Sequence, residues 1–227
     1  MWLISTAILA SVISVSPDPE PKELVPGIFI AQGVVEFDAK VAIDCHHEGT
    51  PDVYLEMFIT APDSREHESL LVATIKPSSL HAALLAAGFE PGAPMSFNEK
   101  TNTRIRATGD QLIIEVIIDD HEPIAIETWV VHVETAKPLQ SSPDWTTFVF
   151  AGSKLTDRGY AADADATIAA LTAFTTETIA PAWTLSPDAA TDEPVWIANR
   201  DLVPEQGKSV RVRITAPPEK TAPADQE

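Results

Sequence analysis

The sequence predicts an α+β domain in which a β-rich mixed or antiparallel sheet is accompanied by one well-defined helix. Several short runs are rich in β-branched and aromatic residues with partial alternation, and one stretch has helical spacing with clear ends. In addition, 44% of the 227 residues are apolar, which is enough to bury a core. We therefore expect a single domain over residues 27–216.

The first predicted elements are strands. Residues 27–42 and 53–60 carry β-branched and aromatic side chains in partial alternation, as strands of a half-covered sheet do. Residues 69–75, with the sequence SLLVATI, are apolar on both faces, which is typical of a central strand covered on both sides. We expect residues 69–75 in the middle of the sheet.

A helix is predicted over residues 78–88. Ser78 can cap its N-terminus, and Gly88 supplies its C-terminal stop. Between these ends runs an apolar stripe formed by Leu80, Leu84 and Ala87. This segment is the best-defined helix in the chain.

Strand patterns return in the C-terminal half. Residues 111–119 and 123–133 are apolar runs joined by a short polar turn, which predicts a β-hairpin. In residues 209–215, valine and isoleucine alternate with polar side chains, which predicts a half-buried strand. Residues 160–179 are ambiguous, because their alanines favour a helix while their threonine and isoleucine content permits a strand.

Charge and cysteine content narrow the function. The formal net charge is −19, from 34 acidic and 15 basic side chains, which repels nucleic-acid phosphates and anionic lipid headgroups. We therefore expect no nucleic-acid partner, and no membrane contact beyond an N-terminal anchor. Cys45 is the only cysteine, so an intramolecular disulfide is excluded. A ferredoxin-like role is excluded too, since iron–sulfur clusters need about four thiolates.

The two ends of the chain have the composition of segments outside the domain. Residues 2–15 form an apolar run, shorter than the roughly 20 residues of a transmembrane helix, and a proline-rich polar stretch follows it. Residues 1–16 are thus predicted to be a signal peptide or an N-terminal anchor, and the protein to be periplasmic or secreted. No lysine or arginine precedes the run, so a buried first strand is the alternative. Residues 17–26 are predicted to be a linker and residues 217–227 a disordered tail.

A longer stretch carries a family resemblance. Residues 65–92 read REHESLLVATIKPSSLHAALLAAGFEPG, and further matching motifs are Asp144-Trp145, Phe148, residues 150–153 (FAGS), Trp196, Asn199 and residues 203–207 (VPEQG). Together they resemble the YdjY-type domain of exported bacterial proteins, a family without an assigned activity. The resemblance covers roughly residues 27–217 and implies that residues 160–179 include a strand. The chain departs from the family pattern where Asp165 or Ala166 replaces a turn glycine.

The candidate functional residues are His67, Glu68 and Ser69, joined by His81 on the predicted helix. Histidine and carboxylate together can bind a divalent metal or share a proton near neutral pH. At about 3.3 Å per strand residue and about 1.5 Å per helix residue, however, His67 and His81 would lie some 20 Å apart. The alternative is that these side chains are hydrogen-bonded structural anchors. No cofactor other than a divalent metal is indicated.

An aromatic binding surface is the remaining candidate. Trp183 lies in the proline-flanked sequence Pro181-Ala182-Trp183, and we predict it to be the exposed aromatic residue. The resulting hypothesis is a non-catalytic envelope or secreted binding module whose partner is a protein or a small ligand. Two alternatives are a metal-assisted or acid–base enzyme that uses His67 and Glu68, and an assembly partner with a long exposed edge strand.

Overall fold

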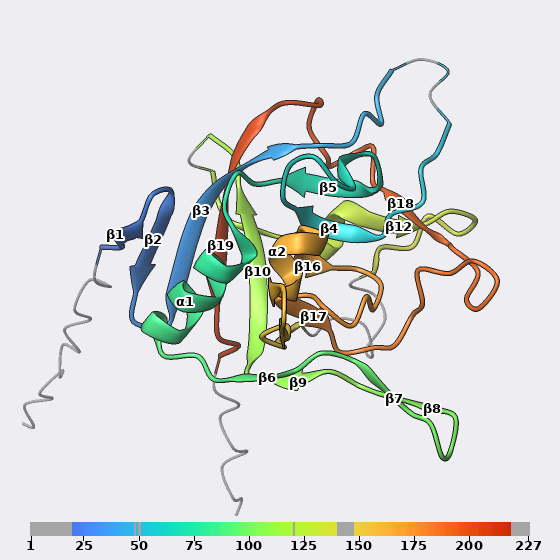
Figure 1. Ribbon diagram of the computed structural model, residues 1–227. Coiled ribbons are helices and arrows are strands. Elements are labelled where there is room, and N and C mark those ends of the chain that lie inside the picture. Colours follow the sequence, from blue (N-terminus) through green and yellow to red (C-terminus); the bar gives the residue numbers. More distant parts are fainter. Residues whose placement is uncertain (1–19, 48, 50, 120, 140–147, 219–227) are drawn as a thin grey trace, which may run out of the picture.

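The computed structural model describes residues 20–218 except residues 48, 50, 120 and 140–147 (Figure 1). Its helices are α1 (Pro77–Ala87) and α2 (Ala161–Asp165), with 3-10 turns η1 (Glu66–Glu68) and η2 (Ile126–Trp129). Its strands are β1 (Lys22–Val25), β2 (Ile28–Ala31), β3 (Val34–Val41), β4 (Met57–Thr60), β5 (Ser69–Val72), β6 (Pro91–Ala93), β7 (Ser96–Asn98), β8 (Thr103–Ile105), β9 (Thr108–Gly109), β10 (Gln111–Ile117), β11 (Ile124–Ala125), β12 (Val130–His132), β13 (Phe148–Phe150), β14 (Leu155–Thr156), β15 (Gly159–Tyr160), β16 (Thr167–Ala170), β17 (Ile179–Pro181), β18 (Trp196–Ala198) and β19 (Ser209–Thr215).

The main sheet closes into a barrel. Its strands follow the order β3-β19-β10-β13-β17-β16-β4-β5, and β5 returns to pair with β3. The sheet is mixed, because the pairs β4–β5 and β16–β17 are parallel while the other pairs of the ring are antiparallel. The predicted β-rich class with one long helix is thus confirmed in outline, and closure into a barrel is the feature that the prediction lacked.

Alternation along the strands fills the barrel interior. In β19, Val210, Val212 and Ile214 are buried, while Arg211 and Arg213 on the opposite face stay half-exposed. Strand β10 has the same pattern, so the predicted half-buried strand over residues 209–215 is confirmed and has a matching neighbour. All four residues of β4 are buried, since this part of the wall is covered on both faces.

Helix α1 forms where the sequence predicts it. Gly88 adopts φ 100°, a left-handed conformation, and its N–H donates to the carbonyls of the last turn, which ends the helix. The helix packs against β2, β3 and β16. The predicted cap is wrong, however, because Lys76 is the capping residue and Ser78 lies in the first turn. The Ser78 hydroxyl instead donates to Asp163 Oδ2 at 2.7 Å and ties α1 to α2.

Residues 160–179 contain both a helix and a strand, the two structures that their sequence allows. They form helix α2, then strand β16, and then a loop that leads to β17. The implied strand is therefore present but short. Ala166 ends α2 with φ 56°, a left-handed conformation that glycine adopts more readily than alanine.

Three other strand predictions need shortening. The hairpin of β10 and β11 is confirmed, but the second strand stops at Ala125, because turn η2 then carries Trp129 into the core. The strand predicted over residues 69–75 ends at Val72, and the strand predicted over 53–60 begins only at Met57. The last two strands end where their pairing with distant strands ends, and local composition does not encode that pairing.

The N-terminal side of the domain begins earlier than predicted. Residues 22–25, within the expected linker, form β1 and pair with β2, and Val25 packs against the core. Residues 1–16 of the expected signal peptide and most of the expected tail lie outside the described residues. Within the described part of the chain, no helix is long and apolar enough to cross a membrane.

Candidate functional site

His67 and Glu68 lie in turn η1 and Ser69 begins β5, and the three side chains have different surroundings. Ser69 is buried, and its hydroxyl donates to the Arg65 carbonyl at 2.5 Å, so it closes the turn. His67 is exposed to solvent, with Nε2 3.8 Å from Glu68 Oε1. Glu68 lines a cavity.

His81 lies in a different environment from His67. Its Nδ1 is 3.0 Å from the Tyr160 hydroxyl, and its ring meets the ring of Phe150 edge to face. Burial lowers the pKa of His81, which favours the neutral ring. Burial also raises the pKa of Tyr160 to about 12. These contacts are those of a structural anchor that joins α1 to β13 and β15.

The structure therefore does not bring His67 and His81 together at one ion. Among the residues that the structure describes, no three His, Cys, Asp or Glu side chains are grouped so that they could hold a metal. The convergence that the metal hypothesis requires is not found within those residues.

Glu68 instead belongs to a cavity of about 230 Å³ that we call the acidic cleft. The cleft lies between the segment before β4, turn η1 and the loop that leads into β18. Its walls include Tyr54, Glu56, Glu68, Leu185, Asp192 and Trp196. Residues 54–56 and 68 thus meet Thr172 and residues between 185 and 196 around one small cavity.

Glu56 and Glu68 form a carboxyl pair inside the acidic cleft. Burial raises the pKa of Glu56, and the negative charge of Glu68 and a hydrogen bond to its side chain raise it further. Arg65 opposes this shift from 3.6 Å, measured between Arg65 Nε and Glu56 Oε2. Glu56 therefore holds a proton more readily than an isolated glutamate does.

Backbone hydrogen bonds fix the pair in place. Glu56 N donates to the Glu68 carbonyl at 2.9 Å, and the Glu56 carbonyl accepts from the N–H groups of Leu171 and Thr172. On the other wall, Leu55 N donates to the Trp196 carbonyl at 2.9 Å. Both sides of the cleft are therefore anchored to the same short segment.

The aromatic residues that line the cleft are Tyr54 and Trp196, whereas the sequence analysis predicts Trp183 at the surface. Trp183 is only 5% exposed and its indole N–H donates to the Leu171 carbonyl, so the prediction that it is a surface aromatic is wrong. Tyr54 is 44% exposed, and Trp196 is half-buried with its ring edge against His132. Trp196 belongs to a family motif, whereas no sequence signal marks Tyr54.

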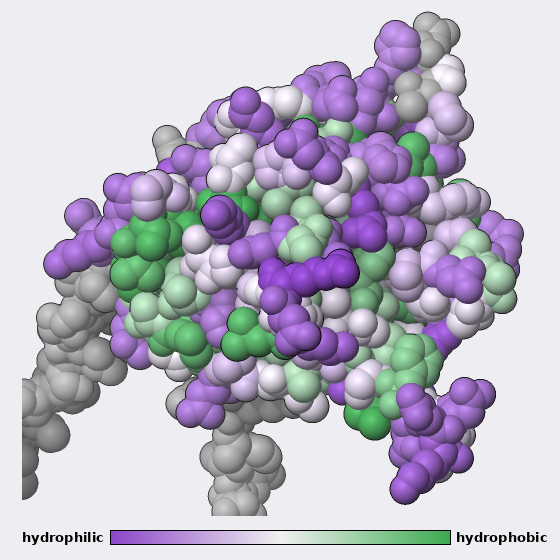
Figure 2. All heavy atoms as spheres, viewed as in Figure 1, coloured by the Kyte–Doolittle hydropathy of each residue, from purple (hydrophilic) through white to green (hydrophobic). Residues whose placement is uncertain are grey.

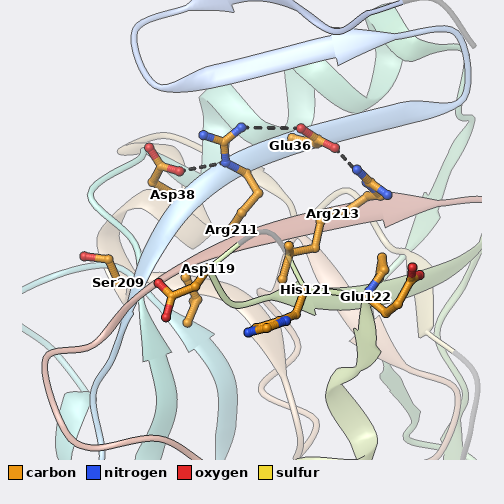
Figure 3. A pocket seen from close by; sticks show the side chains of 11 residues that line it. Glu36, Asp38, Asp119, His121, Glu122, Ser209, Arg211 and Arg213 are labelled. Carbon is orange, nitrogen blue, oxygen red and sulfur yellow. Dashed lines mark hydrogen bonds and ion pairs between the residues drawn. The ribbon is translucent and has the colours of Figure 1, made fainter.

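A larger groove of about 620 Å³ lies on the outer wall of the barrel (Figure 3). Figure 3 shows Arg211 between Asp38 and Glu36, with Arg213 on the other oxygen of Glu36. Glu36 is buried, and the Arg213 Nε to Glu36 Oε1 distance is 2.6 Å. Since strands β3 and β19 pair these charges with each other, we interpret the groove as an ion-paired part of the barrel wall.

Comparison with known proteins identifies one family. The model of the YdjY domain matches residues 30–215, which include every strand of the barrel and the acidic cleft. No curated protein and no solved structure matches the chain significantly.

Proposed function

Because this chain belongs to the YdjY domain family, we propose that it is an exported, non-catalytic binding module whose acidic cleft receives a cationic side chain of a partner protein. The single observation that carries this proposal is the Glu56–Glu68 carboxyl pair, held beside Tyr54 and Trp196 in a small, partly enclosed cavity.

The chemistry of the cleft suits an ammonium or guanidinium group. Carboxylates form the strongest hydrogen bonds with such cations, and aromatic faces attract them as well. Burial raises the pKa of Glu56, and repulsion between its carboxylate and that of Glu68 raises it further. A bound cation relieves that repulsion, so the cleft has a reason to prefer a positive ligand over a neutral one.

The volume of the cleft and the net charge of the chain also favour a single cationic side chain as the ligand. The cavity of about 230 Å³ is smaller than the roughly 300–1,000 Å³ of sites for drug-sized molecules, so one side chain suits it better than a whole small molecule. The net charge of −19 also steers cationic partners toward the surface.

Export is supported by the sequence. The apolar run over residues 2–15, followed by proline-rich residues 17–21, is the pattern of a signal peptide or an anchor. Fractionation of cells that express the full chain tests this part of the proposal, and recovery only in the cytoplasm would contradict it.

An acid–base enzyme is the second candidate function, because burial and the neighbouring Glu68 raise the pKa of Glu56, as they do in carboxyl groups that act as general acids. A metal-assisted version would use His67 with Glu68. Elemental analysis of natively purified protein, beside a His67→Ala variant, tests that version. Stoichiometric metal that is lost in the variant would favour it over the binding module.

The binding proposal is tested by calorimetric titration with trilysine amide at about 0.15 M salt, where long-range attraction is screened. We expect Glu68→Gln to weaken binding by about tenfold or more, since a charge-assisted hydrogen bond is lost. The matched control is Glu122→Gln, which removes one charge from the outer groove instead. Equal losses in both variants would show that trilysine binds only to the overall negative charge.

A further inference from the structure

The β7–β8 hairpin projects from the barrel (Figure 1). Its two strands pair with each other in a separate two-stranded sheet. Phe97 on β7 is 58% exposed, and Ile105 on β8 is exposed too. Figure 2 shows a hydrophilic tip on this hairpin with apolar residues near its base.

The register of the hairpin places Phe97 on the side that faces the cleft. Phe97 lies directly opposite Arg104, so their side chains share one face of the ribbon, whereas Ile105 lies on the other face. The Arg104 guanidinium donates to the Thr184 carbonyl at 2.5 Å and to Asp192 Oδ2 at 2.6 Å. Asp192 lines the acidic cleft, so Arg104 fixes the hairpin to the wall of the cleft.

These contacts set the spacing between the cleft and Phe97. Opposed side chains of a strand pair start about 5 Å apart, and the Arg104 side chain spans the rest, which puts Phe97 on the order of 10 Å from Asp192. An extended peptide advances about 3.3 Å per residue. About 10 Å corresponds to three residues of an extended peptide. Because its side chains alternate between two sides, the residue that points the same way as the cation and reaches Phe97 is the fourth one further along.

The negative charge of the surface favours a positively charged partner at the acidic cleft and Phe97 over a second copy of this chain. A second copy of this chain would bring another net charge of −19 to a surface whose three carboxyl groups, Glu56, Glu68 and Asp192, outnumber their two cationic neighbours Arg65 and Arg104. A segment with positive charge meets no such repulsion. An apolar residue on that segment would cover the exposed ring of Phe97.

We propose that the partner segment is an extended peptide with a cationic residue in the acidic cleft and an apolar residue, about four positions away, on Phe97. This inference rests on the proposed function, and it adds the length and the pattern of the recognised sequence.

The test compares two peptides, acetyl-Lys-Gly-Ser-Gly-Leu-amide and its analogue with serine in place of leucine. We expect the leucine peptide to bind the wild-type protein about fivefold more tightly, because part of its side chain is buried on Phe97. Phe97→Ser should remove that difference. Leu155→Ser is the matched control, since Leu155 is 87% exposed on β14, and this variant should keep the difference.

The outcomes separate the two proposals. If both peptides bind equally well to the wild-type protein and Glu68→Gln weakens both, the role of Phe97 is overturned while the proposed function stands. If the fivefold difference persists in Phe97→Ser, the apolar contact lies elsewhere and the inference fails. If neither peptide binds, both proposals fail. A change in oligomeric state of Phe97→Ser, measured by light scattering, would show that a second copy covers Phe97 and would also overturn the inference.

Discussion

Because of Glu127, the free energy of unfolding should be higher in mild acid than at pH 8. Its side chain lies in turn η2 with only 5% exposure, and Oε2 has no hydrogen-bond partner among the described residues. Burial raises the pKa of Glu127 from 4.5 to about 7, and the negative charge of nearby Glu115 adds to the increase. The folded protein therefore binds this proton more tightly than the unfolded chain does.

The sign and size of the effect follow from that pKa difference. A group whose pKa is raised by folding contributes stability that is fully present below pH 4.5 and is lost as the pH rises through about 7. One pKa unit corresponds to about 1.4 kcal/mol, so the loss between pH 4.5 and pH 8 is on the order of 3 kcal/mol. Glu127→Gln removes the charge, and it should stabilise the fold by up to about that amount at pH 8.

Urea unfolding of the wild-type protein and of Glu127→Gln, at pH 5 and at pH 8, measures this effect. We expect similar free energies of unfolding at pH 5 and a more stable variant at pH 8. The exposed Glu122→Gln serves as the control, with little change at either pH. If Glu127→Gln changes the free energy of unfolding equally at both pH values, the raised pKa is not the cause and our reasoning is refuted.

Three further predictions concern the anchors and the cleft. His81→Ala and Tyr160→Phe should each lower the free energy of unfolding by about 1–3 kcal/mol, because both break the same partly buried hydrogen bond. A double-mutant cycle should therefore show coupling between them. A loss of trilysine binding in either variant would mean that His81 belongs to the binding site. Glu36→Gln should lower the free energy of unfolding by roughly 1–3 kcal/mol, since it weakens two charge-assisted hydrogen bonds from arginine. It should leave trilysine affinity unchanged. An unchanged free energy of unfolding would contradict the structural interpretation of the groove on the outer wall. Trilysine affinity should fall as the pH is lowered, because protonated Glu56 does not attract a cation. The fall should begin at a pH above the ordinary pKa of glutamate, since the pKa of Glu56 is raised. Calorimetry across the pH range would show constant affinity if Glu56 played no part.

Local sequence patterns predict the helix and several strands because their signals lie within a few residues. The stop at Gly88 and the alternation in β19 are both visible without the fold. Barrel closure is different, since it depends on Lys40 and Val41 pairing with Val72 and Leu71, residues some thirty positions away. Composition indicates that a strand is present there, but it does not indicate which strand will be the neighbour.

The candidate site was only partly predictable for the same reason. Glu68 stands out in a polar triplet, and Trp196 lies in a family motif, but Glu56 sits inside an apolar run and has no distinguishing neighbours. The prediction for Trp183 is wrong because its flanking prolines suggest exposure, whereas its indole N–H donates to the buried carbonyl of Leu171. The convergence of residues 56, 68 and 196 depends on the packing of η1, β4 and β18.

The most direct test of cation binding in the acidic cleft is a nuclear magnetic resonance titration of the isotope-labelled protein with trilysine amide. We predict the largest shifts at the amides of Glu56 and Glu68 and at the indole N–H of Trp196, with none of these shifts in Glu68→Gln. Shifts concentrated at Arg211, Arg213 and Glu122 would instead place binding in the outer groove and contradict the proposed role of the acidic cleft.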